Sequence, residues 1–149
     1  MRPIAEARIG PQMRLMPLNM TKIAYRIDSF SELRERLRAR AQAEGGLFHS
    51  TRYRPKRHEE MVGGSLYWII AHRIMARSEI LGFRESPDGR TLILLSPRLV
   101  PVRSQAKRAH QGWRYLEEAD APADLDGEDD AMADMPAKMI GELTKLALL

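Results

Sequence analysis

The chain has 149 residues, of which 44% are hydrophobic and 30% charged, a composition typical of one globular domain. It contains no cysteine, which excludes disulfides, thiolate nucleophiles and cysteine metal sites and fits a reducing cytoplasm. The net charge of +4 favours anionic partners, and no apolar run approaches the roughly 18 residues of a membrane span, so we expect a cytoplasmic protein without a membrane anchor.

The first stretch, residues 1–14, has no hydrophobic period and carries two prolines and a glycine. We expect a disordered extension and not a signal peptide, because prolines and charges interrupt any apolar core. A single α+β domain is expected over residues 15–116, and it opens with an extended element at residues 15–27.

The clearest helix is predicted at residues 29–44. Ser29 and Glu32 have the spacing of a capping box, in which two side chains satisfy free backbone N–H groups at the start of a helix. Gly45-Gly46 ends it, because glycine takes the left-handed cap conformation at little cost. Four apolar residues at helical spacing give the helix one buried face: Phe30, Leu33, Leu37 and Ala41.

After this helix the pattern predicts a strand at residues 47–53 and one helical turn at residues 57–62. The run 66–75 is nearly all apolar, so its period fits a buried strand and a buried helix equally. We choose the strand, because Tyr67 to Ile70 are strand formers and the preceding Gly63-Gly64 favours a turn.

A hairpin follows. Ser86-Pro87-Asp88-Gly89 is typical of a tight turn, since proline fixes φ at the first central position and glycine accepts a positive φ. It joins predicted strands at residues 80–84 and 91–96, and residues 99–102 extend the sheet beyond Pro97.

The last part of the chain is acidic and then amphipathic. Residues 117–134 hold nine acidic residues and no basic one, which predicts a solvated linker. Pro136 suits the first turn of a final helix at residues 135–149. Its apolar face would dock on the domain or on a second copy, as a homodimer, through four residues: Met139, Ile140, Leu143 and Leu146.

Positive charge and aromatic residues are concentrated between Thr51 and Arg114. This segment has thirteen Lys or Arg against five Asp or Glu, and it contains both tryptophans. Cations interleaved with aromatic rings favour a flat, anionic ligand. The sequence therefore predicts a non-catalytic module that binds RNA or another single-stranded nucleic acid.

The predicted phosphate contacts begin with the basic run that follows Thr51. If the strand continued, alternation would place three cations on one face about 6.6 Å apart, near the spacing of successive phosphates. The alternative is that these cations pair with Glu59, Glu60 or the acidic linker. The residues expected to hold phosphate are Arg52, Arg54, Lys56, Arg57, Lys107 and Arg108.

The predicted base contacts come from two aromatic segments. Tyr67 and Trp68 alternate, so at most one serves a given surface and we expect one of them in the core. The segment Gln111-Gly112-Trp113-Arg114-Tyr115 has the residues to hydrogen-bond and stack on a base, or to close the end of a barrel. The residues expected to hold a base are Tyr67, Gln111, Trp113 and Arg114.

No catalytic or metal-binding constellation is recognised. The four histidines lack the spacing of metal ligands, and Gly63-Gly64-Ser65 lacks the lysine of a phosphate-binding loop. We therefore expect no metal and no cofactor. An acidic segment after a basic one also predicts that the linker covers the basic surface, an attraction that salt would weaken.

Several blocks resemble an uncharacterised bacterial family, the domain of unknown function numbered fourteen-eighty-nine. The most specific blocks are Gly63-Gly64-Ser65-Leu66-Tyr67-Trp68 and Gln111-Gly112-Trp113-Arg114-Tyr115-Leu116, and the resemblance covers residues 18–125. It implies membership but no mechanism. The chain departs from the family pattern at Ala71-His72-Arg73, where a lysine–glycine pair is expected, and this departure leaves open whether the chain turns there.

A second resemblance concerns the fold. The early helix, the Thr-Arg strand and the Gly-Gly entry into an aromatic strand are similar to small PUA-like and ASCH-like barrels. This likeness implies a mainly antiparallel mixed sheet curled into a barrel, with RNA or modified bases as ligands. It also implies the enzyme alternative, an amidohydrolase-like activity on a modified nucleoside that would use Thr51, Lys56 and Glu59. The apolar face of the predicted C-terminal helix, and not this likeness, gives a third alternative, a protein-interaction module that dimerises through that helix.

Overall fold

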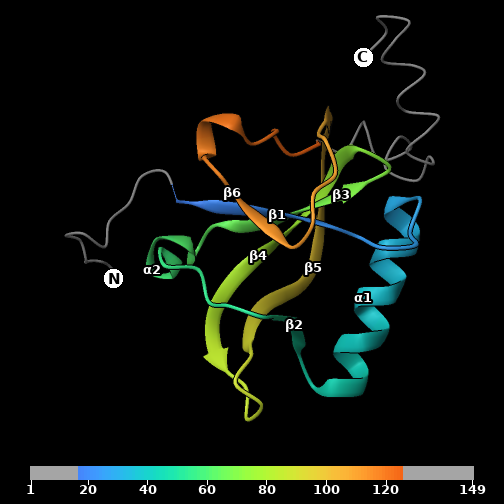
Figure 1. The fold of residues 1–149 in the computed structure, drawn as a ribbon. Helices are drawn as coiled ribbons and strands as arrows, with labels where there is room; N and C mark the ends of the chain where they lie inside the picture. The colour runs from blue at the N-terminus through green and yellow to red at the C-terminus, as the bar shows by residue number, and fades with distance from the viewer. Residues whose placement is uncertain (1–16, 126–149) are drawn as a thin grey trace, which may run out of the picture.

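The computed structural model describes residues 17–125, which form a six-stranded mixed sheet with one long helix packed against it (Figure 1). The strands are β1 (Asn19–Ile23), β2 (Leu47–Thr51), β3 (Ser65–Ile70), β4 (Arg73–Glu85), β5 (Thr91–Ala106) and β6 (Trp113–Leu116). The helices are α1 (Phe30–Glu44), α2 (His58–Met61) and the 3₁₀ turn η2 (Glu118–Asp120). The strand order is β2-β5-β4-β3-β1-β6, in which β1 and β3 are parallel and all other neighbours antiparallel.

Helix α1 begins and ends as its sequence predicts. The Ser29 hydroxyl accepts a hydrogen bond from the Glu32 N–H (3.2 Å), while the Glu32 carboxylate accepts from the N–H of Asp28, one residue before the expected partner (3.3 Å). Gly45 ends the helix with φ +71°. Its buried face is Phe30, Leu33 and Leu37, and each such side chain contributes roughly 1.5–3 kcal/mol by leaving water.

The ambiguous run 66–75 is two strands joined by a tight turn. Ile70 pairs with Arg73, and the two residues between them, Ala71 and His72, have φ values of 47° and 65°. Positive φ at both central positions is what the favoured two-residue hairpin turn requires. The strand prediction is confirmed, and the chain does turn where it departs from the family pattern.

The second hairpin is also confirmed. Ser86 donates its N–H to the Arg90 carbonyl (2.7 Å), and Gly89 has φ +86°. Strand β5 then runs through Pro97 and includes the predicted extension at residues 99–102.

Strand β3 is buried on both faces of the sheet. Leu66, Trp68 and Ile70 join the main core under α1, whereas Tyr67 and Ile69 belong to a second cluster on the opposite face. The expectation that only one of Tyr67 and Trp68 lies in the core is therefore wrong, because their exposed fractions are 4% and 3%.

Residues 117–125, hereafter the crossing segment, cover this second face. They leave β6 at one side of the sheet and reach β5, where the Ala123 carbonyl accepts the Arg103 N–H (2.8 Å) and Leu125 donates to the Pro101 carbonyl (3.0 Å) (Figure 1). This is the described part of the predicted linker 117–134, and it is held against the sheet.

The predicted barrel is not confirmed. In the described residues β2 and β6 are the two edges of an open sheet and do not pair with each other. Strand β2 ends at Thr51 because its partner β5 begins at Thr91, so no strand remains for it to pair with. The predicted extension 1–14 and the predicted helix 135–149 with its dimer face lie outside the described residues. None of the described helices is long and apolar enough to cross a membrane.

Candidate nucleic-acid interface

The basic run after β2 is not a strand. Arg52, Tyr53 and Arg54 follow the end of β2 in a bent segment, so the alternation that would align three cations on one strand face does not apply. Arg52, Arg54 and Lys56 are nevertheless exposed, and within residues 17–125 none of them forms an ion pair. They remain close in sequence and free to meet a phosphate.

Arg57, at the end of this run, contacts the aromatic block of β6. Its backbone N–H donates to the Tyr115 hydroxyl (3.2 Å), and its guanidinium carbon lies 5.6 Å from the centre of the Tyr115 ring. The Trp113 ring packs edge-on against Tyr115 with centroids 4.9 Å apart. Two motifs separated by 58 residues of sequence thus meet on one surface.

The charge of Arg57 is already balanced. Its Nε and Nη2 nitrogens donate to the Glu60 carboxylate (2.8 and 2.7 Å). Its third nitrogen, Nη1, lies 3.7 Å from the Glu117 carboxylate. The hydrogen bond with Glu60 is the main cause that raises the pKa of Arg57. Arg57 therefore orients the Tyr115 ring rather than offering a free cation.

The predicted base-binding residues do not share one surface. Thr21 of β1 pairs with Tyr67 of β3 and with Arg114 of β6. Residues paired across neighbouring strands point to the same face of a sheet, so Tyr67 and Arg114 both lie on the face that the crossing segment covers. Trp113 and Tyr115 alternate with Arg114 and point to the face of α1. Gln111 is exposed in the turn before β6, next to His110, whose ring nitrogen Nε2 lies 2.8 Å from the Thr21 hydroxyl.

The last two predicted phosphate contacts lie elsewhere. Lys107 directly follows β5 and donates its N–H to the His72 carbonyl (2.9 Å), beside the β3–β4 turn, and Arg108 is its exposed neighbour. Thr51, after which the basic run begins, pairs with Thr91 at the opposite end of β5. Lys107 and Arg108 are thus separated from Arg52, Arg54 and Lys56 by the length of the longest strand.

One exposed residue was missed by reading the sequence. Tyr53 lies between Arg52 and Arg54 and is 71% exposed, but a strand would have placed it on the face away from them. We define the aromatic–cationic surface as residues 52–57 together with Trp113 and Tyr115. No sequence signal places Tyr53 there, because the end of β2 depends on where β5 begins.

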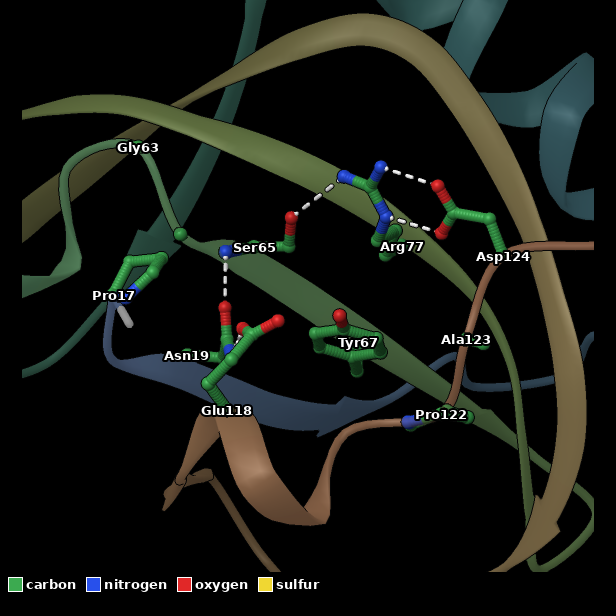
Figure 2. A pocket seen from close by; sticks show the side chains of 11 residues that line it. Pro17, Asn19, Gly63, Ser65, Tyr67, Arg77, Glu118, Pro122, Ala123 and Asp124 are labelled. Atoms are coloured by element: carbon green, nitrogen blue, oxygen red, sulfur yellow. Dashed lines mark hydrogen bonds and ion pairs between the residues drawn. The ribbon is translucent and has the colours of Figure 1, made fainter. Parts of the chain in front are cut away.

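Tyr67 lines a separate pocket of about 320 Å³ between the β3 entry and the crossing segment (Figure 2). Asn19 accepts the Ser65 N–H (2.8 Å) and donates its amide to Glu118 (2.9 Å). Arg77 donates to the Ser65 hydroxyl (3.0 Å) and makes two hydrogen bonds of 2.8 Å with Asp124. Residues from β1, β3, β4 and the crossing segment thus build one polar site.

The glycine pair at this pocket shapes the backbone and does not cradle a ligand. The N–H groups of Gly63 and Gly64 donate to the carbonyls of Ile80 (3.0 Å) and Met61 (2.8 Å), so neither is free for an anion. A Cβ on Gly64 would stand 2.3 Å from the Leu18 carbonyl oxygen, which only glycine avoids.

The residues of the enzyme alternative do not assemble in this pocket. Thr51 is buried, Lys56 and Glu59 are exposed, and none of the three lines it. Among the described residues, no group of three His, Asp or Glu side chains is placed to hold a metal ion.

A family model described as "Protein of unknown function (DUF1489)" matches residues 20–149. Neither the curated proteins nor the solved structures contain a match to the chain, so the PUA-like resemblance is not confirmed.

Proposed function

For this chain, which belongs to the DUF1489 family of proteins of unknown function, we propose single-stranded nucleic-acid binding, with RNA as the first candidate, at the aromatic–cationic surface. The family assigns no activity. The proposal rests on the contact that joins the end of the basic run to the aromatic block of β6.

The single observation that supports it most is the contact between Arg57 and Tyr115. This contact joins the basic run to the aromatic block of β6, two segments that share no neighbouring sequence. A positively charged groove beside exposed aromatic rings is the usual arrangement of proteins that bind single strands without strict sequence preference.

We assign roles to the residues of this surface from their exposure and from their ion pairs. Arg52, Arg54 and Lys56 are exposed and supply phosphate contacts. Tyr53 and Tyr115 present ring faces on which bases stack, and each such contact is worth about 1–3 kcal/mol. Arg57 keeps Tyr115 in place.

This division predicts how binding depends on salt. Three phosphate contacts to a single strand give a slope of about −2 for the logarithm of affinity against the logarithm of salt concentration. Removing the three cations should flatten that slope almost completely, while a stacking variant should lower affinity without changing it.

The experiment is fluorescence anisotropy of labelled single-stranded RNA between about 50 and 200 mM salt. The variant Arg52→Ala/Arg54→Ala/Lys56→Ala is compared with Arg34→Ala/Arg36→Ala/Arg38→Ala, which removes the same charge from the exposed arc of α1. We expect only the first to flatten the slope. Equal losses in both variants would mean that net charge and not this surface holds the RNA, and no binding at the lowest salt would reject the proposal.

A further inference from the structure

The Tyr67 pocket contains one polar group that has no protein partner within the described residues. The Tyr67 side chain is 96% buried (4% exposed), yet within the described residues its hydroxyl has no hydrogen-bond partner. Figure 2 shows this hydroxyl directed into the space between Ser65, Glu118 and Arg77. Among the described residues the one buried polar atom without a partner is His49 Nε2, so the Tyr67 hydroxyl, although its ring is buried, reaches the pocket and is available to an occupant.

The pocket is large enough to hold a small organic molecule and not only a single water molecule. Its volume of about 320 Å³ lies at the lower end of the range for small-molecule sites. Asn19 and Ser65, both almost fully buried, hold each other in place at its base. These groups are positioned by the fold, not by a ligand, which makes the site preformed.

The charges of the lining residues determine which ligand it would accept. Arg77 is neutralised by two hydrogen bonds with Asp124. Glu118 has only the neutral Asn19 amide as a partner and forms no ion pair within residues 17–125. One uncompensated negative charge therefore remains in the pocket, on Glu118.

The electrostatic environment of Tyr67 is also negative. Burial, and after it the Glu118 carboxylate, raises the pKa of Tyr67 to about 12, and the opposing effect of Arg77 is smaller. The hydroxyl thus stays protonated at neutral pH and lies in a locally negative region. Its oxygen is available to accept a hydrogen bond from a cation.

We propose that this pocket binds a small organic ammonium ion, a protonated primary amine on a short apolar body. The Glu118 carboxylate and the Tyr67 hydroxyl accept hydrogen bonds from the ammonium group, and the rings of Pro17 and Pro122 flank the apolar part. Arg77 and Asp124 act as positioning residues that hold the crossing segment in place. The pocket lies on the face opposite α1 and shares no lining residue with the aromatic–cationic surface.

The test uses three probes of similar shape and different charge: propylammonium, propionamide and propionate, at matched ionic strength. Binding is followed by the backbone amide signals of Ser65 and Tyr67 in two-dimensional NMR spectra of the full chain. We expect saturable shifts with propylammonium and none with the other two. Equal responses to all three probes, or no saturable response to propylammonium, would overturn the proposal.

Two variants locate the acceptors. Glu118→Gln keeps an oxygen for the Asn19 amide and should weaken propylammonium binding at least tenfold, while Tyr67→Phe keeps the ring and should weaken it several-fold. Glu44→Gln removes the same charge from the exposed end of α1 and should leave binding unchanged. Unchanged binding in Glu118→Gln, with its spectrum showing an intact fold, would also overturn the proposal.

Discussion

The Arg77 guanidinium and the Asp124 carboxylate form two parallel hydrogen bonds of 2.8 Å across 47 residues of sequence. This pair ties the crossing segment to β4, the strand next to the one at which the segment ends. Composition alone predicts that this acidic stretch is solvated. The pair with Arg77 instead holds it over the second hydrophobic cluster, on the face opposite α1.

Asp124→Asn should therefore lower stability and change its response to acid. The hydrogen bond with Arg77 lowers the pKa of Asp124 below its unfolded value of about 3.9. The contribution of the carboxylate is thus complete above about pH 4 and is lost as the pH falls through the lowered folded pKa. Because the side chains are 25% and 47% exposed, we expect a loss of about 1 kcal/mol at neutral pH.

Urea unfolding at pH 6 and pH 3 measures this. The wild type should lose more stability over that interval than the variant does. Equal losses would show that the pair contributes nothing to folding.

His49 should make stability sensitive to pH in a higher range. Burial, with the nearby charges of Lys22 and Arg40, lowers the pKa of His49 to about 4. The unfolded value is about 6.5, so the neutral ring stabilises the fold fully above that pH and progressively less as the pH falls toward 4. Between pH 7 and 5 this amounts to about 2 kcal/mol.

His49→Leu should remove much of that slope. Within the described residues the ring nitrogen Nε2 is buried and has no hydrogen-bond partner, so leucine gives up no bond there. Urea unfolding of both proteins at pH 7 and pH 5 tests the prediction. If the two proteins lose the same stability, the ring is not kept neutral by the fold.

Gly64→Ala should destabilise the protein by roughly 3 kcal/mol. The new methyl group would stand 2.3 Å from the Leu18 carbonyl oxygen, a backbone atom of the chain entering β1 that cannot rotate away. Gly82→Ala is the matched control, because a Cβ there meets nothing within 4 Å and alanine costs less unfolded-state entropy than glycine. Denaturant unfolding should show a large loss in the first variant and little change or a small gain in the second.

His72→Gly should stabilise the β3–β4 turn by about 0.5–1 kcal/mol. His72 has φ +65°, a conformation that glycine adopts without strain, and its carbonyl bond to the Lys107 N–H does not depend on the side chain. The midpoint of thermal unfolding should rise by a few degrees. A lower midpoint would mean that the imidazole makes a contribution larger than the relief of backbone strain.

The local parts of the fold were predictable because their signals lie within a few residues. Ser29, Glu32 and Gly45 mark the ends of α1. Pro87 and Gly89 predict a hairpin turn from the local sequence, without knowledge of the neighbouring strands. Membership in the family was likewise predictable from two short blocks, and the family match over residues 20–149 confirms it.

The remaining parts depend on contacts between distant residues. Strand β2 ends where its partner begins, at Thr91, and Arg77 fixes the position of the crossing segment. The local sequence of β2 or of the crossing segment does not reveal these distant partners. Both faces of β3 are buried only because α1 and the crossing segment cover them. The pocket escaped prediction for the same reason, since Tyr67 and Glu118 line it together only when the crossing segment is in place.

Ultraviolet crosslinking of single-stranded RNA, followed by mapping of the crosslinked residues by mass spectrometry, tests the proposed function most directly. The chain carries its own control, because Tyr25 is 61% exposed and Tyr53 is 71% exposed, but only Tyr53 belongs to the aromatic–cationic surface. We predict adducts at Tyr53, Tyr115 or Trp113 and none at Tyr25. Adducts at Tyr25, or an even distribution over all exposed tyrosines, would contradict the account.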